Sequence, residues 1–448
     1  QGYCTLCRSR CGTVSEVRED MLIAVRPDPY HPTGEAMCMK GKAAPEIVHS
    51  PHRLHYPLRR TRPKGDVDPG WVRISWEEAL TETAERLGAI KAESGAESIV
   101  FAVTTPSGTP LSDSIDWIER FVRVFGSPNI CYATEVCNWH KDFAHAFTFG
   151  SGLPPADYSQ ADLIVLWGHN PTNTWLAQAN AIGKGRARGA KMVVVDPRPT
   201  ALARQADVWL RVRPGTDAAL ALGLIHLMIS SGRFDEGFVR DWTNGPLLVR
   251  SDNGLFLREQ DLWPHAESNR FLAWSDERGC VVPYDTEQAA QPQLSEHFRL
   301  QGAVPVEAQG APGLVCHPAF GLLAEACALY GPQEVERITG VPEASLHAAA
   351  DLFGTLGRVA YHAWTGIGQH ANATQSERAV ATLYALGGSF DRFGGNRVRR
   401  GPPVNVVNAL SLMSDAQRAK ALGLDERPIG PPASLRLGDS ARHLSRHS

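Results

Sequence analysis

The sequence predicts an α/β protein in which a small, β-rich N-terminal domain precedes doubly wound parallel-sheet domains. Three observations support this prediction. Four cysteines crowd the first 38 residues, apolar strands alternate with helices from about residue 75 onward, and the strand ends carry short polar turns. Alternation of this kind is typical of parallel sheets that are covered by helices on both faces.

The composition is that of an ordinary globular chain and disfavours two classes of protein. Of the 448 residues, 43% are hydrophobic and 21% are charged, with a formal net charge of −3. Such a chain lacks the basic footprint of a nucleic-acid binder, and no run of apolar residues is long enough to predict a membrane span. Residue 1 is Gln, so a cytoplasmic and a periplasmic location both remain open.

The N-terminal cysteines have the spacing of a metal-binding set. Cys4, Cys7 and Cys11 follow the pattern Cys-x2-Cys-x3-Cys, and Cys38 follows in "AMCMKGK". Four soft thiolates favour an iron–sulfur cluster or zinc, but structural zinc normally takes two close cysteine pairs, and Cys11 and Cys38 make no second pair. We predict a [4Fe–4S] cluster in a domain spanning residues 1–57, with zinc and with core or disulfide cysteines as the alternatives.

The residues between the third and fourth cysteines predict a folded module. "GTVSEVRED" and "MLIAVRPD" alternate apolar and polar residues like the strands of a hairpin that turns near Glu19 and Asp20. Lys40 comes two residues after Cys38. A lone lysine is usually a solvated charge, but Lys40 cannot be far from the cluster. It can therefore bridge the cluster to the group that receives the electrons.

The elements after residue 60 follow a strand–helix rhythm. "ISWEEALTETAERLGAIKAESG" predicts a helix with a capping box of Ser75 and Glu78 and an apolar face of Leu80, Ala84 and Leu87. "SIVFAV" and "NICYA" predict strands on either side of a helix over "DSIDWIERFVRVFG". From residue 161 the rhythm repeats more clearly, with strands at "DLIVLWG", "MVVVDP" and "VWLRV" and a helix after "PGT".

The ends of these later strands carry a second signal, because ligands of open α/β sheets bind beyond the carboxyl ends of the strands. Asp196 is placed to bond a ribose or base edge, Gly215 lets the backbone approach a ligand, and Thr216 or Asp217 can cap the next helix. The predicted cofactor-binding residues of these turns are Gly168, Asn170, Asn173, Thr174, Asp196, Arg198, Gly215 and Asp217. A G-x-G-x-x-G fingerprint is absent, which counts against a plain nicotinamide enzyme.

In this order, the cysteine spacing, "CMKGK", "WGHNPTNT", "VVVDPRPT", "PGTDAAL" and "WTGIGQH" resemble the molybdenum or tungsten bis-pyranopterin guanine dinucleotide oxidoreductases. That family contains formate dehydrogenases, periplasmic nitrate reductases and thiosulfate or polysulfide reductases. The resemblance implies bis-molybdopterin guanine dinucleotide with Mo or W, a Rossmann-like dinucleotide-binding domain over 137–378, and an incomplete α/β domain made of 58–136 plus 379–448. It also adds Gly366, Gly368 and Gln369 to the cofactor-binding residues.

The family places its metal ligand on the loop that here reads "TEVCNWHKDF", so the resemblance assigns that role to Cys137. His140 and Lys141 follow closely, and positive charge favours a thiolate. An inert buried cysteine is the alternative. Formate dehydrogenases have His directly after the ligand, where this chain has Asn138, and a formate assignment is weakened accordingly. Arg378 falls where those enzymes keep an arginine near the metal, and it either clamps an anionic substrate or decorates a helix.

The mechanism implied by the resemblance is two-electron redox chemistry of a small substrate, with an anion favoured, as in anaerobic respiration. Electrons then pass by way of Lys40 and the cluster to a partner, an iron–sulfur or cytochrome subunit. The implied catalytic residues are Cys137, His140, Arg378 and Lys40. Three alternatives remain: a non-redox hydratase like acetylene hydratase, a metal-free electron-conducting subunit like that of respiratory complex I, and an α/β binding module with structural zinc.

The end of the chain predicts a truncated family member. Family members are commonly far longer, and a final β-barrel-like domain clamps the pterins from the opposite side. Here the recognisable pattern fades after "FGGNRVRRGPPVNVVNAL", and the segment "GPPASLRLGDSARHLSRHS" reads as a frayed polar tail. We therefore expect the pterin-clamping domain to be missing and the isolated chain to hold its cofactors poorly.

Overall fold

The computed structural model describes residues 1–7, 9–103, 111–132, 139–284, 297–308, 311–355, 357–399, 401 and 403–422. The chain divides into two compact units. The first contains the described parts of 1–139, 171–180 and 400–446, and the second contains those of 140–170 and 181–399. Among the described helices, none is both long and apolar enough to span a bilayer. The division into three domains at the predicted boundaries stays a prediction.

The first unit begins with a small antiparallel sheet that carries the cysteines. Its strands are β1 (Gly2–Tyr3), β2 (Gly12–Arg18) and β3 (Met21–Pro27), and the short helices α1 (Met39–Lys42) and α2 (Ala44–Val48) follow. Glu19 and Asp20 make the turn between β2 and β3 with φ values of 48° and 60°. Left-handed backbone at both central residues is the geometry of the tight turns that match the twist of a hairpin. The predicted hairpin is thus confirmed.

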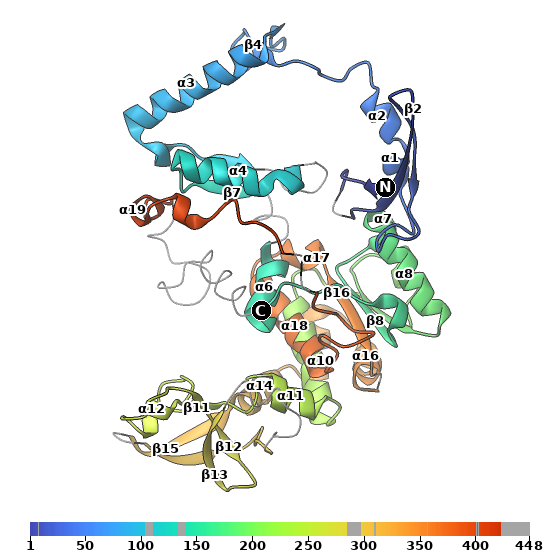
Figure 1. The fold of residues 1–448 in the computed structure, drawn as a ribbon. Coiled ribbons are helices and arrows are strands. Elements are labelled where there is room, and N and C mark those ends of the chain that lie inside the picture. The colour runs from blue at the N-terminus through green and yellow to red at the C-terminus, as the bar shows by residue number, and fades with distance from the viewer. Residues whose placement is uncertain are drawn as a thin grey trace. The chain divides into compact units, whose positions relative to one another are not determined.

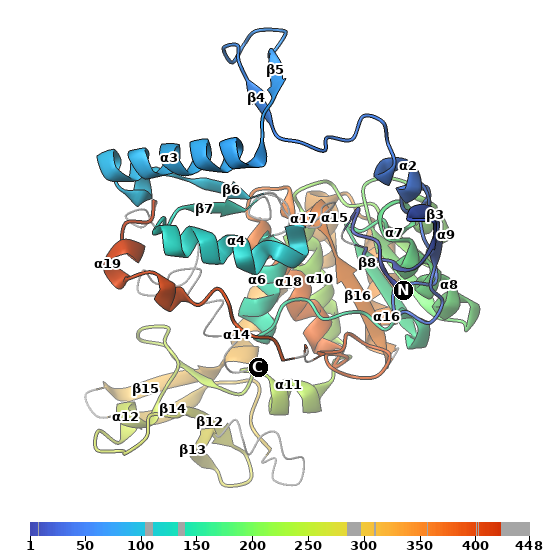
Figure 2. The ribbon, with the colours of Figure 1, turned by 45° about the horizontal axis from the view of Figure 1, so that its top comes forward.

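The rest of the first unit contains a second hairpin and a two-stranded parallel sheet. The elements are β4 (Leu58–Arg60), β5 (Trp71–Arg73), α3 (Trp76–Ser94), η1 (Ala96–Ser98), β6 (Phe101–Val103), α4 (Leu111–Phe125) and β7 (Ile130–Tyr132). Figure 2 shows the β4–β5 hairpin leading into α3. The predicted capping box of Ser75 and Glu78 is present, but α3 buries no residue, and Leu80 is 65% exposed. The predicted apolar face of α3 is therefore not a buried face in this chain.

The C-terminal described segment binds to the same region of the first unit. It contains η3 (Leu410–Leu412) and α19 (Asp415–Arg418). Arg120 donates a hydrogen bond to the Val407 carbonyl at 2.8 Å, and the Leu422 N–H donates to Asn129 Oδ1 at 2.8 Å. Lys420 Nζ forms an ion pair with Glu97 at 2.7 Å. Chain segments almost 300 residues apart in sequence thus build one structure around β6 and β7.

The second unit is built on a four-stranded parallel sheet in the order β10–β9–β8–β16. Figure 1 labels two of its strands, β8 and β16. Its strands are β8 (Leu163–Trp167), β9 (Lys191–Val195), β10 (Val208–Leu210) and β16 (Val359–Ala363). Leu163 pairs with Lys191 of β9 on one side and with Val359 of β16 on the other. The chain therefore adds β9 and β10 on one side of β8 and later returns to add β16 on the other side. This is the doubly wound order that the strand–helix rhythm predicts.

Helices cover both faces of this sheet. Leu163, Val165 and Trp167 face a core shared with α10, α16 and α18, while Ile164 and Leu166 face a second core shared with α8 and α9. Side chains alternate between the two faces of a strand, so a fully apolar strand such as "LIVLW" serves both cores. The helices around the sheet are α6 (Trp139–Phe149), η2 (Tyr158–Gln160), α8 (Leu176–Ala187), α9 (Ala201–Gln205), α10 (Asp217–Ser230), α11 (Glu236–Trp242), α14 (Ala319–Ala328), α15 (Pro332–Thr339), α16 (Glu343–Thr355), α17 (Thr365–Gly368) and α18 (Ala373–Leu386).

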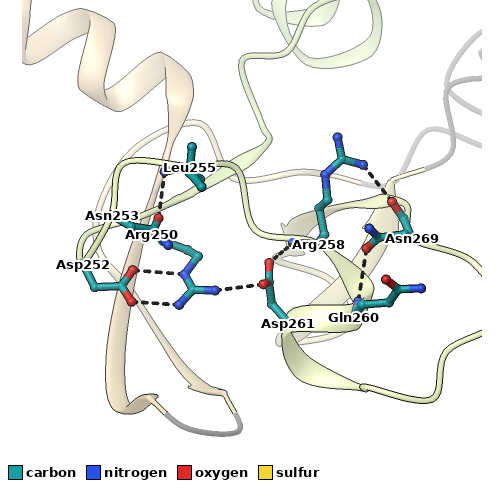
Figure 3. A network of polar contacts seen from close by, with 8 residues as sticks. All are labelled: Arg250, Asp252, Asn253, Leu255, Arg258, Gln260, Asp261 and Asn269. Atoms are coloured by element: carbon teal, nitrogen blue, oxygen red, sulfur yellow. Dashed lines mark hydrogen bonds and ion pairs between the residues drawn. The ribbon is translucent and has the colours of Figure 1, made fainter. Parts of the chain in front are cut away.

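An antiparallel module is inserted between α11 and α14. It consists of β11 (Leu248–Arg250), α12 (Glu259–Leu262), β12 (Phe271–Ser275), β13 (Cys280–Tyr284), β14 (Val304–Ala308) and β15 (Ala311–Pro318). Leu248, Leu272 and Cys316 belong to its own buried core. Within the module, the Arg250 guanidinium forms ion pairs with Asp252 at 2.8 Å and with Asp261 at 2.9 Å (Figure 3). The antiparallel strands thus form a module with its own interior.

Candidate functional site

The four N-terminal cysteines are neighbours in the β1–β2–β3 module. The Cys4 N–H donates to the Cys11 carbonyl at 2.8 Å, and Cys38 is the N-cap residue of α1. Burial raises the pKa of the Cys11 thiol, and the nearby thiolates of Cys7, Cys4 and Cys38 raise it further. This mutual repulsion requires the four sulfurs to lie within electrostatic reach of one another. Bound cations would remove it, because they offset the gathered negative charge.

The four thiols are the donor set of a [4Fe–4S] cluster, which takes one thiolate at each of its four irons. Among the described residues, no three His, Cys, Asp or Glu side chains are grouped so that they could hold one metal ion. Gly41 keeps space beside the site, since a Cβ there would meet Met37 Cγ at 2.8 Å and lie 3.4 Å from Cys4 Sγ. Lys40 lies next to Gly41 on α1, and its side chain is exposed.

A second site feature lies in the other unit, at the C-terminal ends of β8 and β16. Gly168 and Gly366 approach so closely that a Cβ on Gly366 would meet Gly168 Cα at 2.6 Å. The Gly366 N–H donates to the Gly168 carbonyl at 3.3 Å, and Gly168 has a φ of 58°. Strand order reverses between these two strands, and ligands of doubly wound sheets bind at that switch point. The absence of side chains therefore lets the turns after β8 and β16 meet backbone to backbone at this switch point.

The two predicted carboxylates flank this sheet end in different ways. Asp196 directly follows β9 and is 6% exposed, and its Oδ1 accepts a hydrogen bond from the Arg198 N–H at 2.8 Å. Asp217 begins α10 and is also 6% exposed, and its Oδ1 accepts from Trp167 Nε1 at 2.7 Å. Burial raises the pKa of Asp217, although the Trp167 hydrogen bond opposes the shift. The indole thus occupies one acceptor position of Asp217, and a guanosine contact at this residue stays a prediction.

The other predicted cofactor-binding residues lie on turns and short helices. Gly215 has a φ of 84°, and a Cβ there would lie 3.7 Å from the His370 ring. Gly368 ends α17, Gln369 is its exposed C-cap residue, and Arg198 is exposed after β9. The structure brings Gly168 together with Gly366, and Gly215 with the turn after α17. Asn170 belongs to the second unit, whereas Asn173 and Thr174 are exposed residues of α7 (Pro171–Thr174) in the first.

The roles of the four predicted catalytic residues, Cys137, His140, Arg378 and Lys40, stay predictions. Cys137 lies outside the described residues, and so does Asn138. His140 lies in the first turn of α6. Arg378 is exposed on α18, where it donates a hydrogen bond to Gln375 Oε1 at 3.2 Å.

Sequence reasoning missed two features of the sheet end. Trp167 is the last residue of an apolar strand, which predicts core packing alone, yet its indole N–H positions Asp217. The second feature is a group of buried titratable residues on α6, β16 and the turn after β8. His169 lies inside a quoted motif, but a single histidine next to a strand gives no signal of its partners. Both features depend on contacts between residues far apart in sequence.

Comparison with known proteins identifies the family. The family model described as molybdopterin oxidoreductase matches residues 53–435, and the model described as molybdopterin oxidoreductase Fe4S4 domain matches residues 1–50. The chain is 28% identical over 430 residues to a sulfite dehydrogenase subunit of Allochromatium vinosum, covering 88% of this chain and 43% of that protein. It is 32% identical over 244 residues to the thiosulfate reductase molybdopterin-containing subunit of Salmonella typhimurium, covering 54% of this chain and 31% of that protein.

The fold has a relative among solved structures. Acetylene hydratase from Pelobacter acetylenicus matches with a TM-score of 0.63 and 25% identity, over 87% of this chain and 43% of that one. The chain thus spans less than half the length of these relatives. Because the two family models together cover residues 1–50 and 53–435, the chain belongs to the molybdopterin oxidoreductase family, whose Fe4S4 domain it carries, and its cofactors are molybdopterin and a [4Fe–4S] cluster.

Proposed function

We propose that this chain is the catalytic part of an oxidoreductase that carries out two-electron redox chemistry on a small substrate, with an anion favoured. When bound, the molybdenum or tungsten of the cofactor exchanges the electron pair with the substrate. Cys4, Cys7, Cys11 and Cys38 hold the cluster that relays single electrons. The partner that receives or supplies them is an iron–sulfur or cytochrome subunit, in line with the relatives that are named as subunits.

The chain's own residues have distinct roles in this proposal. Cys137 supplies the thiolate ligand of the metal, His140 and Arg378 act on the substrate, and electrons pass between cofactor and cluster by way of Lys40. Gly168 and Gly366 let the turns after β8 and β16 pack together at the switch point, where the dinucleotide binds, and Gly368 and Gln369 continue the turn after β16. Asp196 and Asp217 hold a guanosine end, since a carboxylate can accept from both the N1–H and the amino group of guanine.

One observation carries the proposal. A four-thiol module and a doubly wound sheet with a glycine-lined switch point occur in one chain, in the order in which the two family models match it. A cluster and a dinucleotide site in the same chain are what electron relay requires. An α/β binding module with structural zinc would explain the cysteines but not the glycine contact between β8 and β16.

A non-redox hydratase is the second candidate. Acetylene hydratase of Syntrophotalea acetylenica is 34% identical over 249 residues, covering 54% of this chain and 33% of that protein. The solved acetylene hydratase also shares the fold over most of this chain. Hydration consumes no electrons, so this candidate predicts product formation from acetylene without any electron donor or acceptor.

The deciding experiment combines metal analysis with paired assays on anaerobically purified protein. Iron, molybdenum, tungsten and zinc are quantified, and reduced viologen oxidation is followed with nitrate, thiosulfate or sulfite, while viologen reduction is followed with formate. Electron transfer with Mo or W present supports the redox proposal. Acetaldehyde from acetylene without a mediator supports the hydratase. Zinc in place of iron and of Mo or W overturns both.

A matched pair of variants tests the proposed metal ligand. Cys137→Ala should abolish turnover and leave the cluster absorption and iron content intact. Cys131→Ala is the control, because Cys131 is exposed on β7 and has no proposed role. Full activity of Cys137→Ala with an unchanged metal spectrum would place the ligand elsewhere.

A further inference from the structure

Buried titratable residues gather where β8 and β16 end, and no sequence motif explains them. His145 is fully buried, His169 is 2% exposed, and Lys141 and His362 are each 7% exposed. All four belong to the second unit of the chain. Charged or titratable side chains of this kind are rarely buried without a structural or chemical role.

Two of these residues form a histidine pair with tilted rings. The ring centroids of His169, just after β8, and His362, on β16, lie 4.4 Å apart. Trp364 closes one side, with its ring 5.6 Å from His362 and 6.1 Å from His169. Lys141 Nζ lies 5.1 Å from the centroid of the same Trp364 ring. A lysine ammonium and two imidazoles thus share one tryptophan.

Helix α6 connects this pair to a second one. Lys141 and His145 are one turn apart on this helix. His145 contacts Tyr361 on β16, an edge strand of the described sheet, whereas Lys141 contacts Trp364 just after that strand. His145 Nδ1 lies 2.5 Å from the Lys141 carbonyl, and its Nε2 bonds to the Tyr361 hydroxyl. A carbonyl only accepts, so Nδ1 carries the proton and Nε2 of the neutral ring accepts from Tyr361. The hydrogen bonds therefore run in one direction, from Tyr361 through His145.

The charges around the pair restrict its protonation. Burial lowers the pKa of His362 well below its usual range, and His169, Lys141 and His145 lower it further because each can place a positive charge nearby. From α18, buried Glu377 faces Tyr361, whose pKa is raised by burial and then by that carboxylate. A new negative charge close to the pair would raise the pKa of the histidines and favour their protonation.

We propose that His169 and His362 form a proton-uptake site, which is neutral at rest, gains a proton when negative charge arrives nearby, and passes that proton on during catalysis. The site is linked through α6 to the His145–Tyr361 hydrogen bond. The role of this site in catalysis rests on the proposed redox function, whereas the existence of the site does not. Removal of one oxygen atom from an oxyanion as water consumes two electrons and two protons. The electrons come from the partner protein, and the site delivers protons to the departing oxygen. In the oxidising direction, the same site accepts the protons that water releases.

The first test needs no cofactor. Histidine side chains are labelled with ¹³C and ¹⁵N and titrated by NMR, and the signals are assigned with His362→Gln and His169→Gln. We expect His362 to stay neutral at pH values where a solvent-exposed histidine, with an ordinary pKa of about 6.5, is already protonated. Lys141→Met should raise the midpoint of His362 by about one pH unit. If His362 titrates like a solvent-exposed histidine, or if Lys141→Met leaves its midpoint unchanged, the proton-uptake site is disproved.

The second test uses the loaded enzyme and measures a potential instead of a rate. The midpoint potential of the Mo or W signal is followed by EPR at several pH values. It should fall as pH rises, and His362→Gln should lose about half of this dependence while His347→Gln keeps it. The same pH dependence in His362→Gln at equal metal content would overturn the inference. A protein without a Mo or W signal would contradict the proposed function, and the NMR titration alone would then decide the inference.

Discussion

Helices α3 and α10 show how differently one chain uses two helices. α3 has 19 residues, a complete capping box and no buried residue. α10 has 14 residues, no side-chain cap and eight buried residues, which include Leu220, Leu224 and Asp217. Local signals thus stabilise α3, whereas packing against the parallel sheet stabilises α10. The helix with weak local signals is the one that positions a candidate site residue.

The largest expected effect concerns the buried face of α10. Leu224 is fully buried, so Leu224→Ala removes contacts and leaves a cavity, which should cost about 3 kcal/mol of unfolding free energy. The matched variant Leu80→Ala in α3 should change it by less than about 0.5 kcal/mol, because Leu80 is 65% exposed. Urea unfolding followed by tryptophan fluorescence measures both. Equal costs for the two variants would remove the distinction between the helices.

The glycine contact at the switch point should be nearly as sensitive. Gly366→Ala places a Cβ 2.6 Å from Gly168 Cα, which is backbone and cannot rotate away, so the turn must shift at a cost of about 2 kcal/mol. Gly183→Ala in α8 is the control, since nothing lies within 4 Å of the added Cβ. That variant should be neutral or slightly stabilising by helix propensity. Wild-type stability and pterin content in Gly366→Ala would show that the approach is not needed.

The buried Asp217, which accepts the Trp167 hydrogen bond, predicts that the free energy of unfolding depends on pH. Burial raises the folded-state pKa of Asp217, so its contribution to stability is fully present below the unfolded value of 3.8 and is lost as pH rises through the folded value. Trp167→Phe leaves the carboxylate without this donor and should cost about 2 kcal/mol at neutral pH. Asp217→Asn should flatten the pH dependence of the urea midpoint above pH 3.8. An unaltered profile in Asp217→Asn would assign the dependence to other groups.

The smallest effect is expected at the α3 cap. Ser75→Ala removes the hydroxyl that accepts from the Glu78 N–H, at a cost of about 1 kcal/mol confined to the first unit. Hydrogen exchange with mass spectrometry should show faster exchange in the first turns of α3 and unchanged exchange in α10. If protection in α10 falls as well, the two helices unfold together and local capping does not explain α3.

The sequence predicts well what depends on neighbours along the chain. The β2–β3 turn, the α3 capping box and the apolar strands β8 and β9 all follow from spacings within a few residues. It predicts poorly what depends on packing. The apolar face of α3 is exposed, and the pairing of β8 with β16 joins residues almost 200 positions apart.

The candidate site divides in the same way. The cysteine spacing and the glycine turns are visible in the sequence, because each motif is short and chemically specific. The role of Trp167 and the pairing of His169 with His362 are not visible in the sequence, since each requires contacts that only the folded sheet creates. Residues of this second kind have no local pattern, and a histidine or tryptophan at a strand end is ordinary core composition.

The late position of β16 in the sequence bears on when the switch point can form. Leu163 pairs with Lys191 over a short stretch of chain. It pairs with Val359 only after the whole inserted module and the helices α9, α10, α11, α14, α15 and α16 have been made. Contacts of such high sequence separation are slow to form, because the entropy of closing a long loop is lost before the strand pairing contributes any stability. Pulsed hydrogen exchange during refolding should therefore protect β9 before β16. A nascent chain that ends before β16 lacks one of the two strands that form the switch point. The cofactor must therefore bind after the sheet is complete and cannot guide the first steps of its folding.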